Sequence, residues 1–204
     1  MKRIITIQHT QSVHHTNGMT GGWGDWALSD LGVAQASRIG ENLSKELGDA
    51  KYTIYSSDLL RARQTADIVG KHIGMMPIYT DALREINCGA ANGIPQHEAD
   101  KLNTGPMVTI DDVQFPGAES MRDVGNRLAE FLDGILASED ENIMIVSHGV
   151  ALGIFHILWL GLGVEAVNKC LTWCGSGSVS FMHDAPEFGK RMVTRLGDQS
   201  YCRL

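Results

Sequence analysis

Three short apolar runs, each followed by a longer segment with helical spacing, constrain the fold of this chain more than any other feature. The runs are "RIITIQ" (3–8), "YTIYSS" (52–57) and "ENIMIVSHG" (141–149), and their length and β-branched residues are typical of strands. Helices are predicted at 28–47, 58–74, 119–136 and 150–164, and two late strands at 177–184 and 190–197. This alternation predicts an α/β fold, a three-layer αβα sandwich whose largely parallel central sheet is flanked by helices.

The length and composition predict one domain. With 204 residues, 43% of them hydrophobic and 20% charged, the chain can bury a sizeable core. We therefore expect residues 1–204 to form a single domain. The long stretch 88–116 is rich in turn-forming residues, so we expect it to be a lid-like insertion over a site.

Charge and hydropathy narrow the classes of partner. The formal charge of −7 gives no sign of the basic surface that nucleic acids or anionic membranes attract, so neither is expected as a partner. The apolar stretch 150–164 is shorter than a membrane span, and His156 interrupts it. The N-terminal apolar run is too short for a signal peptide, and the four cysteines show no paired spacing. The expectation is a reduced, cytoplasmic protein.

Chemically able residues follow three of the predicted strands. His9 follows the first strand, Arg61 comes soon after the second, and His148 ends the third. Ligands of α/β sheets gather at the carboxyl ends of strands, so these side chains are expected to converge. An arginine offers a planar fork of donors to phosphate, and a histidine serves as nucleophile or acid–base group. This set predicts an anion site suited to phosphoryl transfer without a metal.

Competing motifs are weaker. The glycine-rich "GGWGDW" (21–26) lacks the Gly-Lys-Ser/Thr of a nucleotide-binding loop, and no Gly-x-Ser-x-Gly elbow occurs. His9, His14 and His15 follow no recognised metal-ligand spacing, and adjacent histidines on an extended chain point apart. We therefore predict neither a metal nor a cofactor, and we expect His14 and His15 to be solvated or locally hydrogen-bonded.

Six motifs occur in an order typical of one known family. They are "QHTQS" (8–12), "NGMTGGWGDWALSDLGVAQA" (17–36), "SSDLLRARQTA" (56–66), "LREINCGAANG" (83–93), "PGAES" (116–120) and "VSHG" (146–149). The chain resembles the phosphoglycerate-mutase-like branch of the histidine phosphatase superfamily. The resemblance runs from residue 3 to about residue 182.

The resemblance implies a role for each residue of the site. His9 is expected to be the nucleophile that becomes a phosphohistidine, with Arg61 and His148 cradling the phosphoryl oxygens. Glu85 is expected to protonate the leaving oxygen and then to activate water. The resemblance places the substrate-binding residues at Gln8, Thr10, Ser12 and Asn17, with Asn17 at the edge of the pocket. It implies a small phosphorylated substrate.

Two positions depart from the family pattern. Gln8 stands where the family has arginine, and removing one preorganised donor costs ~10²–10³ in rate. Thr10 stands where the family has glycine, and its side chain is expected to narrow or reshape the pocket. Either another cationic group compensates, or the chain is a slow enzyme or a phospho-ligand-binding protein. The candidates for compensation are Arg63, Arg84, His14 and His15.

Hydrolysis is favoured over the alternatives. His9, Arg61, Glu85 and His148 are all retained, which a pure binding protein has little chemical reason to keep. Mutases of the family are usually longer, with a larger insertion near 88–116. The sequence therefore predicts a metal-independent phosphomonoester hydrolase, with phosphoglycerate-mutase-type transfer as an alternative. The oligomeric state stays open, with a homodimer as one option.

Overall fold

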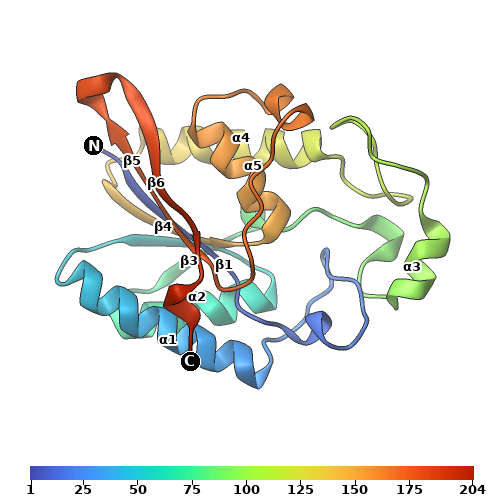
Figure 1. Cartoon of the computed structure of the whole chain (residues 1–204), viewed down its shortest axis with the longest axis horizontal. Helices are drawn as coiled ribbons and strands as arrows, with labels where there is room; N and C mark the ends of the chain where they lie inside the picture. Colours follow the sequence, from blue (N-terminus) through green and yellow to red (C-terminus); the bar gives the residue numbers. More distant parts are fainter.

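Six strands form one mixed sheet in the order β3-β2-β4-β1-β5-β6 (Figure 1). The computed structural model describes residues 1–204. The strands are β1 (Arg3–Gln8), β2 (Thr53–Ser57), β3 (Pro77–Thr80), β4 (Asn142–Ser147), β5 (Val179–Ala185) and β6 (Lys190–Asp198). The first four pair in parallel, and the β5–β6 hairpin adds two antiparallel pairings beside β1. The sheet is therefore largely parallel, as predicted.

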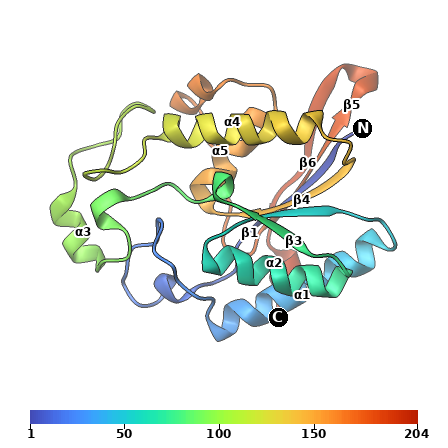
Figure 2. The same ribbon diagram turned by 180° about the vertical axis from the view of Figure 1, so that it is seen from behind.

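Helices cover both faces of the sheet (Figures 1 and 2). One layer holds α1 (Asp30–Leu47) and α2 (Leu60–Ile73), and the other holds α4 (Met121–Ala137) and α5 (Gly149–Trp159). The short α3 (Gln96–Leu102) lies beyond the sheet. The predicted three-layer sandwich is confirmed. None of the helices has the length and apolarity that a membrane crossing requires.

Alternation along the strands divides the core into two halves. In β1, Ile4 packs in the cluster with α4 and α5, whereas Ile5 and Ile7 pack in the cluster with α1 and α2. All three are at most 2% exposed. Because successive strand residues point to opposite faces, a strand covered on both faces is a continuous apolar run. The same reasoning explains the run in β4.

Two elements were not predicted from the sequence, and one helix ends earlier than predicted. The edge strand β3 is short and half-exposed, so it lacks the apolar run that marks a buried strand. The helix α3 lies inside the turn-rich stretch 88–116. The helix α5 ends at Trp159 rather than at residue 164. The backbone at Gly161 is left-handed, with φ +77°, and a residue in this conformation ends a helix.

The stretch 88–116 packs against the loop that follows β1. Ala91, Ala99 and Phe115 form a small cluster of their own. The hydroxyl of Thr20 donates to the carbonyl of Ile94 over 3.1 Å. These contacts join the predicted insertion to the loop that carries the site.

A buried histidine anchors α5 to the sheet. The Nε2 atom of His156 lies 2.9 Å from Thr6 Oγ1, and its Nδ1 lies 2.8 Å from Thr172 Oγ1. Burial lowers the pKa of His156 to about 4, so this side chain is neutral near pH 7. The histidine within the predicted helix is thus a hydrogen-bonded core residue.

The start of α1 is locked to the loop after β1. Ser29 caps the helix by accepting from the N–H of Gly32 over 3.1 Å. The hydroxyl of Thr10 donates to the carbonyl of Gly32 over 2.8 Å. A Cβ atom at Gly32 would lie 1.9 Å from the carbonyl oxygen of Gln11, so only glycine permits this approach.

We predict that Gly32→Ala destabilises the fold by about 1–3 kcal/mol, because the added methyl group forces the loop away from α1. The matched control is Gly134→Ala in α4, where a Cβ meets nothing within 4 Å. There the helix propensity of alanine should raise stability by about 0.4–1 kcal/mol. Urea unfolding of both variants measures the difference. Equal stability for the two variants would contradict the predicted lock.

Candidate active site

The carboxyl ends of β1 and β4 lie side by side and carry the two central histidines. The parallel register pairs Gln8 with Ser147, so His9 and His148 are the next residues on neighbouring strands. The N–H of His9 donates to the carbonyl of Ser147 over 2.9 Å, and the two imidazole centroids are 5.1 Å apart. The helices that follow these strands, α1 and α5, leave toward opposite faces of the sheet. This divergence creates the crevice in which α/β folds bind ligands.

Arg61 joins the two histidines from the first turn of α2. Its side chain is 1% exposed, and its Nε–H donates to His9 Nε2 over 3.2 Å. Its Nη1 and Nη2 donate to the carbonyls of Gly24 and Gly22 over 2.8 and 2.7 Å. A guanidinium has five N–H groups, so these three contacts leave two for a ligand.

The hydrogen bonds of His9 define its tautomer. Its Nδ1 lies 2.8 Å from the carbonyl oxygen of Thr10, which only accepts, so Nδ1 carries the proton. Its Nε2 then presents a lone pair, which accepts the Arg61 N–H. An imidazole in this tautomer is set up as a nucleophile at Nε2.

The second histidine carries a buried donor without a partner. His148 Nε2 lies 2.8 Å from Ser57 Oγ, which already accepts from the N–H of Leu59 over 3.3 Å. His148 Nε2 is the acceptor within hydrogen-bond reach of the Ser57 hydroxyl, so this buried hydroxyl donates to Nε2 and the ring proton of His148 lies on Nδ1. This Nδ1 is fully buried and has no hydrogen-bond partner. Such a donor is costly to leave unpaired, which indicates a place for an anion.

Hydrogen bonds to both its side chain and its backbone hold Glu85 at the crevice. Its carboxylate accepts from the backbone N–H groups of Ile86 at 2.9 Å and of Val150 and Ala151 at 3.2 Å each. The last two N–H groups belong to the first turn of α5, so the helix fixes the position of this carboxyl group.

The backbone of Glu85 is fixed as well. Its carbonyl accepts from Trp23 Nε1 at 2.7 Å and from Arg127 Nη2 at 2.9 Å. Sequence reasoning missed Arg127 as a positioning residue. It lies far from Glu85 along the chain, so no local spacing connects the two.

Burial and charge set the protonation of the site. Burial first, and then the Arg61 guanidinium, lowers the pKa of His9 and of His148 well below the usual 6.5. Both imidazoles are therefore neutral near pH 7. Burial also lowers the pKa of Arg61, to about 10, so its guanidinium keeps its charge at that pH.

Three of the residues predicted to bind substrate differ in their exposure to solvent. Gln8 is 9% exposed, and its Oε1 is buried without a donor. Ser12 is buried, with Oγ 2.5 Å from His14 Nδ1. Asn17 is exposed, and its Oδ1 accepts from the N–H of Met19 over 3.0 Å. The structure thus places Gln8 and Ser12 inside the protein and Asn17 at the surface.

The side chain of Thr10 is hydrogen-bonded to the start of α1. Its hydroxyl bonds the Gly32 carbonyl, and its N–H donates to Thr65 Oγ1 over 3.2 Å. Both contacts lie with the helices α1 and α2. The expectation that Thr10 narrows or reshapes the pocket stays a prediction.

The arginines expected to compensate for Gln8 are engaged elsewhere. Arg84 donates to both carboxylate oxygens of Asp58, over 2.7 and 2.5 Å, and stacks on Trp23 at 4.7 Å. The guanidinium of Arg63 lies over the Tyr79 ring at 4.8 Å. Neither arginine supplies a free cation to the crevice.

The two neighbouring histidines bring no formal charge either. Burial, then His15 and Arg61, lowers the pKa of His14 to about 3. Burial and Arg61 also lower the pKa of His15. Near neutral pH, Arg61 is thus the cation in contact with His9.

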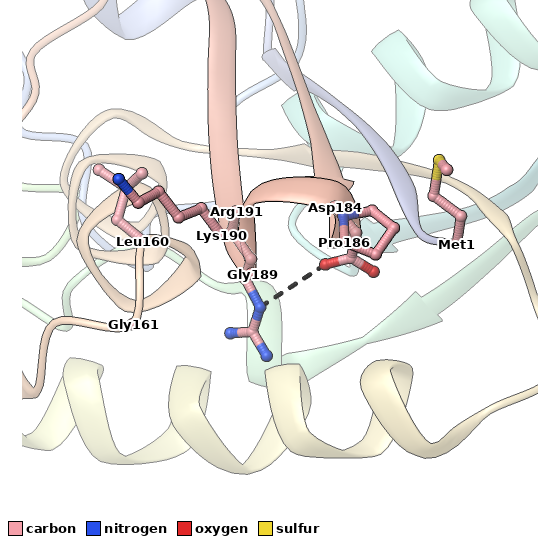
Figure 3. Close-up of a pocket in the computed structure, with 8 residues that line it drawn as sticks. All are labelled: Met1, Leu160, Gly161, Asp184, Pro186, Gly189, Lys190 and Arg191. Atoms are coloured by element: carbon pink, nitrogen blue, oxygen red, sulfur yellow. Dashed lines mark ion pairs between the residues drawn. The ribbon is translucent and has the colours of Figure 1, made fainter.

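A large cavity of about 740 Å³ lies elsewhere in the molecule (Figure 3). It is bordered by Met1, by the end of α5 and by the turn of the β5–β6 hairpin. Its charged side chains include Arg191 and Asp184, which face each other at 3.8 Å. The cavity holds none of the residues of the crevice, and its lining carries no nucleophile beside a base.

The carboxyl ends of the parallel strands thus bring together two imidazoles, a buried guanidinium and a carboxylate, a set of groups that is able to carry out phosphoryl transfer. A family model described as the histidine phosphatase superfamily (branch 1) matches residues 4–190. The chain belongs to this superfamily. The family predicted from the sequence is confirmed, and with it the enzyme class, a phosphatase of the histidine phosphatase type.

Relatives within the family carry different names. A protein of Hydrogenobacter thermophilus named putative phosphoserine phosphatase 2 is 30% identical over 171 residues, 81% of this chain and 82% of that protein. A probable phosphoglycerate mutase GpmB of Erwinia tasmaniensis is 29% identical over 177 residues, 83% of this chain and 80% of that protein. Both similarities span most of the two chains compared.

Solved structures share the fold over nearly the whole chain. The native structure of mycobacterial glucosyl-3-phosphoglycerate phosphatase has a TM-score of 0.79 and 25% identity, covering 96% of this chain and 98% of that one. The structure of Bacillus stearothermophilus YhfR has a TM-score of 0.81 and 24% identity and covers 100% of both chains.

We predict that His9 is still neutral, with its proton on Nδ1, at pH 6.5, where an ordinary imidazole is half protonated, because burial and the Arg61 guanidinium lower its pKa well below that value. Nitrogen-15 NMR of the imidazoles measures this directly. Arg61→Gln removes one of the two main causes and should raise the pKa of His9. A midpoint near 6.5 in the unaltered protein would contradict the burial argument.

Proposed function

We propose that this chain is a metal-independent phosphomonoester hydrolase that acts through a phosphohistidine on His9. One observation carries the proposal: the His9 Nε2 lone pair lies 3.2 Å from the buried Arg61 Nε–H. The unpartnered Nδ1 of His148 borders the same crevice. Nucleophile and anion donors therefore meet at one point, as phosphoryl transfer requires.

In the first step, His9 Nε2 attacks phosphorus as the bond to the ester oxygen breaks. Glu85, in its protonated form, gives its proton to the departing oxygen, so the product leaves as an alcohol. Arg61 and His148 Nδ1–H donate to the phosphoryl oxygens while their charge is redistributed. The His9 Nδ1–H bond to the Thr10 carbonyl stabilises the phosphorylated ring.

In the second step, water attacks the phosphorus and the P–N bond breaks. The Glu85 carboxylate accepts a proton from that water, which restores its acid form. Inorganic phosphate leaves, and His9 Nε2 regains its lone pair. No step needs a metal, because Arg61 and the imidazole N–H groups supply the donors that a cation otherwise supplies.

Phosphoglycerate-mutase-type transfer is the second candidate, favoured by the relative named probable phosphoglycerate mutase GpmB. A mutase must retain its product and exclude water between the two transfers. The stretch 88–116 contributes no more than the short α3 and one 3-10 turn at Gly89–Ala91, and so small an insertion favours hydrolysis. Phosphoryl migration between substrate hydroxyls that outpaces phosphate release would identify the mutase.

The partner we propose is a small phosphorylated molecule, with neither nucleic acid nor membrane involved. The crevice offers one guanidinium and several neutral donors, which suits a single phosphoryl group. We also propose a cytoplasmic location, supported by four cysteines that are all free thiols. The oligomeric state, with a homodimer as one option, stays a prediction.

We predict that the protein hydrolyses p-nitrophenyl phosphate in the presence of a chelator, and that His9→Ala abolishes this activity. Quenching of the unaltered protein in alkaline detergent should trap a phosphoprotein that is stable in alkali and labile in acid, as expected for phosphohistidine. The control is His97→Ala on α3, an exposed side chain that should leave activity unchanged. Activity that disappears with the chelator, or that survives His9→Ala, would refute the proposal. Phosphate binding without any phosphoprotein would identify a binding protein instead.

We predict that Glu85→Gln slows hydrolysis by about 10²–10⁴-fold for an alkyl phosphate, because the leaving alkoxide needs its proton. The first step should slow much less for p-nitrophenyl phosphate, which has a good leaving group. Val150 and Ala151 donate to different carboxylate oxygens, so the amide oxygen of glutamine keeps one of the two α5 hydrogen bonds, and the fold should persist. Rapid-mixing kinetics should then show a stoichiometric burst of nitrophenolate and an accumulated phosphoprotein. An equal loss for both substrates would argue against Glu85 as the acid.

A further inference from the structure

The site has an unexplained gap, since Gln8 brings no charge and the candidate arginines are engaged elsewhere. We propose that His15 fills this gap by donating its Nε2–H to an oxygen of the bound phosphoryl group. This inference rests on the proposed function and assigns a further substrate-binding residue to it. The cradle is then completed by a neutral N–H donor rather than by a second cation.

The position of His15 is the first observation. Its ring stacks on the ring of His9 with the centroids 5.4 Å apart and the planes 19° apart. His15 is exposed to solvent while its ring stacks on the buried His9, which places it at the outer edge of the crevice. Asn17, the residue expected at that edge, is exposed and bonded to Met19 instead.

The hydrogen bonding of His15 is the second observation. Its Nδ1 accepts from the backbone N–H of Ser12 over 3.3 Å. A neutral imidazole that accepts at Nδ1 carries its proton on Nε2. No protein group pairs with this Nε2–H, so a ligand beside His9 finds a free donor.

The packing of His14 keeps His15 in this orientation. The His14 ring lies 4.1 Å from that of His15, and its Nδ1 is 2.5 Å from Ser12 Oγ. On its other side, a Cβ built at Gly21 would lie 2.9 Å from His14 Nε2, so the loop closes tightly over the ring. Ser12 thus orients both imidazoles, and we assign His14 as a positioning residue.

The test measures the binding of inorganic phosphate and orthovanadate, by calorimetry, to the unaltered protein and to its variants. We expect His15→Ala to weaken phosphate binding by about 10–100-fold, the effect of losing one hydrogen bond to a charged group. We expect His15→Gln, which retains an N–H donor, to recover most of this loss. The control His97→Ala removes an exposed imidazole elsewhere and should bind as the unaltered protein does.

A compensating variant separates this role from simple packing. Gln8→Arg adds a charged donor within the crevice, so it should restore phosphate binding in the His15→Ala background. A lost stacking contact would not be restored in this way. Thermal unfolding of each variant checks that the fold is retained.

The outcomes distinguish this inference from the proposed hydrolysis. Unchanged phosphate binding by His15→Ala, with normal turnover, overturns the inference alone. Weakened binding by His15→Ala in a protein that forms no phosphohistidine supports the His15 donor and overturns the hydrolase. A protein that binds neither phosphate nor vanadate overturns both proposals. The His15 donor alone is overturned if His15→Ala, His15→Gln and the double variant Gln8→Arg/His15→Ala all lose phosphate binding to the same extent.

Discussion

The buried hydrogen bond from Arg61 Nε to His9 Nε2 is the contact around which the rest of the site is arranged. An unpaired guanidinium at 1% exposure is costly, so the loop carbonyls of Gly22 and Gly24 must fold over it. The same charge, added to burial, keeps His9 neutral, so that its Nε2 lone pair accepts the Arg61 N–H instead of a proton. One interaction therefore shapes the loop after β1 and prepares the nucleophile.

The anion cradle of this chain depends mainly on neutral donors. His148 holds its proton on Nδ1 because Ser57 donates to its other nitrogen. His15 holds its proton on Nε2 because Ser12 donates to its Nδ1. Backbone and hydroxyl donors thus select the tautomer of each ring, so that an N–H group is presented without a formal charge. A neutral glutamine beside them is consistent with such a site.

The sequence predicted the layers of the fold and several of the residues that converge. Apolar runs ending at His9 and His148 indicated parallel strands, and pairing in register does bring the two imidazoles to 5.1 Å. The short, exposed β3 and the helix α3 carry no comparable pattern, since neither buries a full apolar face. The bond from the Thr10 hydroxyl to the start of α1 could not be predicted, because sequence spacing does not tell on which side of a loop a side chain lies.

Local chemistry by itself determined the elements, the strand ends and the identity of the groups that reach the crevice. Only the tertiary structure decided how these groups are protonated and which hydrogen bonds they make. Three contacts could not be read from the spacing of residues along the chain. They are the ion pair of Arg84 with Asp58, the hydrogen bond from Arg127 to the Glu85 carbonyl and the stacking of His15 on His9. The hydrogen bonds and the burial of a side chain depend on which segments of the chain pack together. These two properties determine which ring nitrogens carry protons, and the chemistry depends on those positions.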